Sequence, residues 1–178
     1  MTTRSVIHDT FTIERSYPVT PSQVFAAFAS EDAKNAWGDT GDLEPAGGAA
    51  GGAVEPAGGA VAGAAAGTEF DFRVGGRERF GFRYEGREYR YDALYYDIVP
   101  DQRIVYSYEM YADDVRISVS VATIEFAKSG DGTALAWTEQ GTYLDGIDGP
   151  EAPGLRQEGT GEMLDGLTSY LAQAARRG

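Results

Sequence analysis

The sequence predicts an α+β fold in which helices cover one face of an antiparallel sheet of about seven strands. Residues 68–143 contain successive segments in which apolar and polar side chains alternate, as in half-buried strands, and only short turns separate them. Two short helical segments follow the first strand, and one long helical segment ends the chain. At 178 residues, the chain is long enough to bury the core of a single domain without cross-links.

The chain begins with a predicted strand followed by two short helices. Apolar and polar side chains alternate over residues 11–17. Thr20 is expected to cap the first helix, because Pro21 suits the first helical position and Gln23 completes the pattern of a capping box. The second short helix is predicted over residues 31–37.

Residues 46–67 differ in composition from the rest of the chain. Of these 22 residues, 18 are Ala or Gly, and none is aromatic. Such a segment buries too little apolar surface to offset the entropy of ordering it, so we predict a flexible insertion within the single domain. A marginal helix is the alternative, and paired glycines oppose it.

Six further strands are predicted after this insertion. Because turns of a few residues separate them, consecutive strands are expected to pair as an antiparallel meander. The predicted strands are residues 69–74, 77–84, 87–99, 103–111, 116–126 and 133–143.

The final helix is predicted within residues 149–177, where apolar residues recur at helical spacing. The residues of this predicted buried stripe are Met163, Leu167, Tyr170, Leu171 and Ala174. Three glycines also occur in the segment, each costing roughly 1 kcal/mol relative to Ala in a helix interior. They indicate unusually close packing on the sheet, room for a ligand, or an irregular first turn; they are Gly159, Gly161 and Gly166.

The composition excludes several classes of function. The net charge of −13, from 28 acidic and 15 basic residues, repels phosphate backbones and anionic lipid, so we expect neither nucleic-acid nor membrane partners. No apolar run approaches the roughly 20 residues of a membrane span, and the N-terminus lacks the apolar stretch of a signal peptide. Since there is no Cys, we expect a cytoplasmic protein without disulfides. The oligomeric state stays open, a dimer included.

Four stretches resemble the Aha1-like (AHSA1) family, named after the activator of Hsp90 ATPase, within the SRPBCC superfamily of START and Bet v 1-like proteins. They are IERSYPVTPSQVFAAF at 13–28, FDFRVGGR at 70–77, YDIVPDQRIVYSYEM at 96–110 and RQEGTGEMLDGLTSYL at 156–171. The resemblance implies a helix-grip fold, in which a curved sheet grips the C-terminal helix around a cavity for a hydrophobic or amphipathic small molecule. The chain begins directly at the first strand, without the additional N-terminal domain of the eukaryotic activators, so we do not expect Hsp90 activation.

Candidate cavity residues come mainly from the aromatic faces of the predicted strands and from the last helix. Most of them also suit an ordinary core, and Arg73 suits either a ligand anion or a structural ion pair at its turn. The candidates are Trp37, Arg73, Phe82, Tyr91, Tyr95, Tyr106, Tyr108, Met110, Trp137, Glu139, Met163 and Leu167.

Three functions remain open after this reasoning. The first is binding of a small hydrophobic molecule without a metal or cofactor. The second is a cyclase- or hydratase-like enzyme of the superfamily, in which Glu139 or Asp97 acts as general acid or base. Because buried glutamates are rare, we expect Glu139 to lie at a solvated strand edge, which opposes this role. The third is a chaperone-associated interaction protein. A catalytic triad or histidine metal site is not expected, because His8 is the only histidine.

Overall fold

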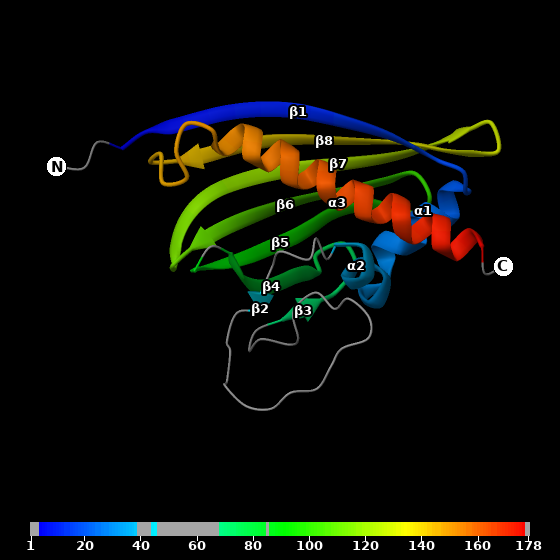
Figure 1. Ribbon diagram of the computed structural model, residues 1–178, viewed down its shortest axis with the longest axis horizontal. Coiled ribbons are helices and arrows are strands. Elements are labelled where there is room, and N and C mark those ends of the chain that lie inside the picture. The colour runs from blue at the N-terminus through cyan, green and yellow to red at the C-terminus, as the bar shows by residue number, and fades with distance from the viewer. Residues whose placement is uncertain (1–3, 39–43, 46–67, 85, 177–178) are drawn as a thin grey trace.

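The computed structural model describes residues 4–38, 44–45, 68–84 and 86–176. In this part of the chain, one antiparallel sheet carries three helices on the same face (Figure 1). The predicted α+β architecture with a long C-terminal helix is therefore confirmed. The predicted flexible insertion at residues 46–67 lies outside the described residues.

Six long strands form most of the sheet, and two strands of two residues each pair with β4. The order across the sheet is β1-β8-β7-β6-β5-β4-β2, with β3 also on β4. Strands β4 to β8 form the predicted meander, and β1 pairs with the last strand. Their bounds are β1 (Val6–Tyr17), β2 (Glu44–Pro45), β3 (Glu69–Phe70), β4 (Arg77–Tyr84), β5 (Arg87–Val99), β6 (Arg103–Ala112), β7 (Val115–Ser129) and β8 (Gly132–Leu144).

The strand predicted over residues 69–74 is wrong beyond its first two residues, because a compact turn follows β3. The Asp71 amide donates to the Arg77 carbonyl at 2.8 Å, and the Gly76 amide donates to the Arg73 carbonyl at 2.8 Å. A side chain at Gly76 would meet the Asp71 carbonyl oxygen at 2.0 Å. These contacts favour the turn over a continued strand, although the side-chain alternation alone favours a strand.

Helices α1 (Pro21–Ala29) and α2 (Glu31–Gly38) occur where the sequence predicts them. The Thr20 hydroxyl accepts from the Gln23 amide, and the Gln23 side chain accepts from the Thr20 amide, so the predicted capping box is present. The indole of Trp37 donates to the Ala27 carbonyl at 2.8 Å, which ties the end of α2 back to α1.

Helix α3 (Ala152–Ala175) is the long final helix, but its buried stripe is rotated relative to the prediction. Met163 and Tyr170 are only partly buried and Ala174 is exposed. The prediction missed Leu164, which is fully buried. The stripe is shared between two neighbours, because α3 contacts both the sheet and α2. Its buried residues are Ala152, Thr160, Leu164, Leu167 and Leu171.

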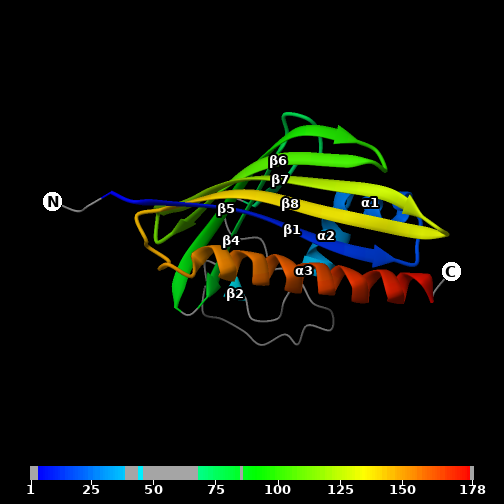
Figure 2. The same ribbon diagram turned by 90° about the horizontal axis from the view of Figure 1, so that it is seen from above.

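The sheet curves, and α3 crosses the inner side of the curve (Figure 2). Helices α1 and α2 cover the same side near the C-terminal end of α3 (Figure 1). The core between these layers is rich in aromatic side chains, including Phe28, Trp37, Tyr106 and Trp137. Among the described residues, no helix is both long and apolar enough to cross a membrane.

Candidate functional site

The space between α3 and the sheet has two halves with different contents. We call the part under Leu164 to Leu171, together with α1 and α2, the packed half. We call the part under Ala152 to Gly161 the polar half. Each half contains some of the residues that the sequence predicted to line a cavity.

The packed half is closed by direct contact between α3 and α2. A Cβ atom on Gly166 would lie 2.2 Å from the Trp37 carbonyl oxygen, so only glycine fits at this contact. Leu164 and Leu167 are fully buried beside it. Of the three explanations for the helix glycines, close packing therefore applies to Gly166, although its neighbour is α2 and not the sheet.

The core of the packed half contains a void of only about 10 Å³. This volume is at the lower limit for one water molecule and excludes an organic ligand. Trp37, Tyr95, Tyr106 and Trp137 are all at most 5% exposed here. The void is lined by Phe28, Lys34, Phe72, Tyr95, Ile104, Tyr106, Ile124 and Trp137.

A carboxylate also lies in this closed region. Glu78, on β4, accepts hydrogen bonds through its Oε2 atom from Lys34 and from the Tyr95 hydroxyl, the latter at 2.6 Å. The Lys34 ammonium lies 5.8 Å from the centre of the Phe70 ring. Burial, reinforced by Glu78, raises the pKa of the Tyr95 hydroxyl, so this hydroxyl stays protonated and donates to the carboxylate.

The polar half contains a buried network around Glu139, on β8, which is 0% exposed. The Tyr108 hydroxyl donates to Glu139 Oε1 at 2.5 Å. The Arg156 guanidinium, from α3, donates through Nη1 to the Tyr108 hydroxyl at 2.5 Å and to Glu139 Oε1 at 3.5 Å. Its Nη2 atom donates to the Ser118 hydroxyl at 3.0 Å. The network thus links β6, β7 and β8 to the first half of α3.

The electrostatics of this network keep Arg156 charged and Tyr108 neutral. Burial would lower the pKa of the Arg156 guanidinium, but Tyr108, Glu139 and Tyr143 together raise it. Burial raises the pKa of Tyr108, Arg156 opposes the shift and Glu139 adds to it. Burial likewise raises the pKa of Tyr143 to about 12. The guanidinium also lies 5.3 Å and 5.7 Å from the ring centres of Tyr108 and Tyr143.

Three buried oxygens of the polar half have no hydrogen-bond partner among the described residues: Ser120 Oγ, Glu139 Oε2 and the Tyr143 hydroxyl. Buried polar atoms in native proteins are nearly always hydrogen-bonded, so each exception needs an explanation. The carboxylate oxygen is the most costly exception, because its charge is taken out of water.

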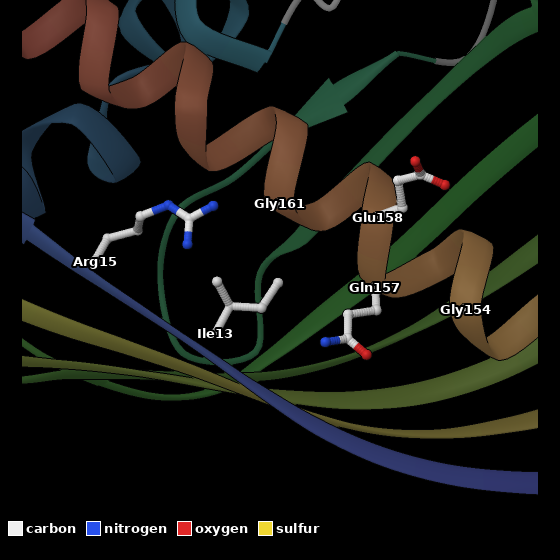
Figure 3. Close-up of a pocket in the computed structure, with 6 residues that line it drawn as sticks. All are labelled: Ile13, Arg15, Gly154, Gln157, Glu158 and Gly161. Atoms are coloured by element: carbon white, nitrogen blue, oxygen red, sulfur yellow. The ribbon is translucent and has the colours of Figure 1, made fainter.

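Beside this network, a groove of about 430 Å³ lies between β1 and the first half of α3. Ile13 and Arg15 extend from β1 toward the helix, and Gln157 extends from α3 toward the sheet (Figure 3). The groove is open to solvent, and Arg15 at its end forms an ion pair with Asp165 at 3.0 Å. Its remaining lining residues are Gly154, Glu158 and Gly161.

The glycines along this groove are not required by close contacts. A Cβ atom on Gly154 would meet nothing within 4 Å, and one on Gly161 would approach only the end of Arg15, at 3.8 Å. Gly159, on an exposed face of the same helix, is equally unobstructed. The helix runs through all three positions, so the alternative of an irregular first turn is wrong. For Gly154 and Gly161, the explanation that fits is room beside the helix.

An aromatic row follows β4 and β5 along the same face of the sheet. Phe80 and Tyr91 stack at 4.8 Å, Phe82 and Tyr89 stack at 5.2 Å, and Tyr91 contacts Tyr108 at 5.0 Å. The four residues of this row are only partly buried. The row thus connects the predicted residues Phe82 and Tyr91 to the Glu139 network.

Several predicted residues lie away from both the network and the groove. Arg73 is exposed and forms an ion pair with Asp71 at 2.8 Å, as expected for a structural arginine at a turn. Asp97 is partly exposed and forms an ion pair with Arg103 at 2.6 Å. Met163 is partly buried against the core, as is Met110.

The expectation that Glu139 lies at a solvated strand edge is wrong. Its position two residues after Trp137 places it on the inward face of β8, and Arg156 supplies the opposite charge. Sequence reasoning missed Arg156, although a signal exists. Arg156 precedes Thr160 and Leu164 at helical spacing, which puts a charged residue in line with the buried stripe.

None of the described residues forms a cluster of His, Cys, Asp or Glu suited to bind a metal ion. The polar half itself offers hydrogen-bonding groups and charges. The Glu139 carboxylate is an acceptor, Arg156 is a cation, and the Tyr108 hydroxyl connects them.

Comparisons with known proteins agree with this architecture. The model of the family of Activator of Hsp90 ATPase homolog 1-like proteins (AHSA1) matches residues 18–172. A protein of known structure from Rhizobium loti is 44% identical, with a TM-score of 0.74, over 93% of this chain and 99% of its own. Another, from Rhizobium leguminosarum, is 35% identical, with a TM-score of 0.77, over 97% of this chain and 99% of its own. No curated protein matches the chain.

Proposed function

Because the chain belongs to the AHSA1 family, we propose that it binds a small amphipathic molecule between the sheet and α3. The structure favours the polar half for this role. The packed half has no room, because its void measures about 10 Å³ and Gly166 contacts Trp37 directly.

The observation that carries the proposal is the groove of about 430 Å³ between β1 and α3. Sites for small organic ligands commonly measure about 300–1,000 Å³. The lining mixes an apolar side chain, Ile13, with the polar side chains of Arg15, Gln157 and Glu158, which suits a ligand with both apolar and polar parts. The unobstructed glycines support the proposal, because each lowers helix stability without relieving a clash.

Filling the groove tests this function. Gly161→Leu would place a side chain in the groove, whereas Gly159→Leu would place the same side chain on an exposed face of the same helix. A thermal-shift measurement with decanol should raise the melting temperature of the wild type and of the Gly159→Leu variant. The Gly161→Leu variant should respond much less. Equal responses of the two variants would show that the groove does not bind this probe.

A second candidate is a cyclase- or hydratase-like activity that uses Glu139. The observation in its favour is that this carboxylate is fully buried beside Tyr108 and Arg156, with one oxygen unpaired. Asp97 has no comparable environment. Mass spectrometry of a candidate ligand, recovered after incubation with the protein, distinguishes binding from catalysis. Binding leaves the ligand unchanged, whereas catalysis yields a product that disappears in a Glu139→Gln variant.

A further inference from the structure

The free oxygen of Glu139 indicates which chemical group the ligand carries. We propose that Glu139 Oε2 accepts a hydrogen bond from a neutral donor at the polar end of the ligand, with a hydroxyl group as the simplest case. The inference rests on the proposed function, and it adds the recognition chemistry. Oε1 is already used by Tyr108 and Arg156, whereas Oε2 is buried without a partner among the described residues.

The register of the sheet places the Glu139 backbone near a groove residue, although Glu139 is not itself among the lining residues. Phe11 on β1 pairs with Glu139 on β8, and Ile13 pairs with Trp137. Ile13 is therefore the diagonal neighbour of Glu139, and such neighbours lie roughly 7–8 Å apart. Ile13 also lines the groove. On α3, Gln157 in the groove follows Arg156 in the network.

The charges of the network favour a neutral donor. Glu139 and Arg156 balance each other, and the raised pKa of Tyr108 keeps its hydroxyl neutral. A carboxylate on the ligand would face the acceptor oxygen of Glu139 without a proton between them, which is repulsive. An ammonium would leave a net positive charge in a buried site, which is unfavourable. A hydroxyl satisfies the oxygen and leaves the net charge unchanged.

Glu78 provides a matched comparison on the same face of the sheet. It is also buried and also accepts from a tyrosine, but it has no buried oxygen without a partner. Its partners Lys34 and Tyr95 belong to the closed packed half. Glu139 therefore has an oxygen that is both fully buried and without a partner, and Glu78 has none of that kind.

The experiment compares decanol with decyl methyl ether, which has the oxygen but no hydrogen to donate, and with decanoate. Calorimetry on the wild type should show decanol binding about tenfold or more tightly than either, because one hydrogen bond to a charged acceptor is lost. In Glu139→Gln, the amide oxygen should keep the contacts of Oε1, so an NH₂ group replaces Oε2 and donates. The preference should then shift toward the ether. Glu78→Gln should keep the preference for the alcohol.

The outcomes separate this inference from the function on which it rests. If Glu139→Gln keeps the alcohol preference, or if the wild type binds alcohol and ether equally, recognition by Glu139 is wrong while groove binding stands. If the wild type binds none of the three probes, the proposed groove function is itself contradicted. The wild-type comparison decides the matter alone if circular dichroism shows that Glu139→Gln does not fold.

Discussion

The glycines in the two halves of α3 differ in their surroundings: one is in tight contact with a neighbouring helix, and the others adjoin free space. In the packed half, Gly166 lies against the Trp37 carbonyl, where a Cβ atom would be 2.2 Å from the oxygen. In the polar half, Gly154 and Gly161 adjoin an open groove and have no such contact. The same residue type thus serves close packing in one half and leaves space in the other. Helix propensity alone assigns all of them the same cost.

The comparison extends to the buried charges of each half. In the packed half, Glu78 and Lys34 meet beside an aromatic cluster whose void measures only about 10 Å³. In the polar half, Glu139 and Arg156 meet beside a groove, and one carboxylate oxygen stays unpaired. A stabilising ion pair and the ion pair of the proposed binding site can therefore look alike in sequence, and they differ in what lies next to them.

The largest expected effect comes from removing the cation of the polar half. Arg156→Met should destabilise the protein by about 3 kcal/mol or more, because Glu139 would remain buried without an opposite charge. Urea denaturation followed by tryptophan fluorescence measures the loss. The double variant Arg156→Met with Glu139→Gln should lose less than the sum of the two single variants. Strict additivity would mean that the pair does not interact.

The next largest effect is expected at the contact of the packed half. Gly166→Ala should destabilise the protein by about 1–3 kcal/mol, although alanine favours helices, because the methyl group meets the Trp37 carbonyl. Urea denaturation would show this loss as a lower free energy of unfolding. A stabilised Gly166→Ala variant would mean that α2 and α3 can separate without cost.

A smaller effect is expected at alkaline pH, where the buried tyrosines Tyr17 and Tyr143 would lose their protons on unfolding. Burial raises the pKa of Tyr17 and of Tyr143 to about 12 each, whereas the unfolded chain titrates near 10. Between these values the unfolded state has lost a proton that the folded state retains, so stability should be complete below pH 10 and decline as the pH rises toward 12. Thermal unfolding across this range should show the decline, and it should be shallower in Tyr143→Phe and in Tyr17→Phe. An unchanged slope in both variants would rule out these hydroxyls as its source.

The smallest effect is a gain in stability on the exposed face of α3. Gly159→Ala should stabilise the protein by about 0.5–1 kcal/mol, because nothing obstructs the methyl group and alanine restricts the unfolded chain. Gly161→Ala should give a similar gain, and only Gly161→Ala should also weaken decanol binding, since Gly161 lines the groove. Melting temperatures and calorimetry of the two variants make the comparison. A loss of stability in Gly159→Ala would contradict the idea that this half of the helix is unobstructed.

The fold was predictable because its signals are local. Alternation marks the long strands, and the capping box from Thr20 to Gln23 marks the start of α1. The turn after Phe70 was missed because the hydrogen bond between Asp71 and Arg77 competes with an alternation that otherwise suits a strand.

The candidate site was less predictable because its parts are distant in the sequence. Tyr108 lies 31 residues from Glu139, and Arg156 lies 17 residues from it. Side-chain parity indicated the inward direction of Glu139, but the rarity of buried glutamates favoured solvent as long as its partners were unknown. The phase of the α3 stripe depends on contacts with α2 as well as the sheet, which periodicity alone does not contain.

The contact between Gly166 and Trp37 has a consequence for how related sequences can diverge. It fixes α3 against α2 near the middle of the helix, at a position C-terminal to all the helix residues that line the groove. Under the proposed function, substitutions at the groove would alter ligand preference without touching this contact. Related proteins that keep this glycine can therefore differ in their groove residues while α3 keeps its contact with α2.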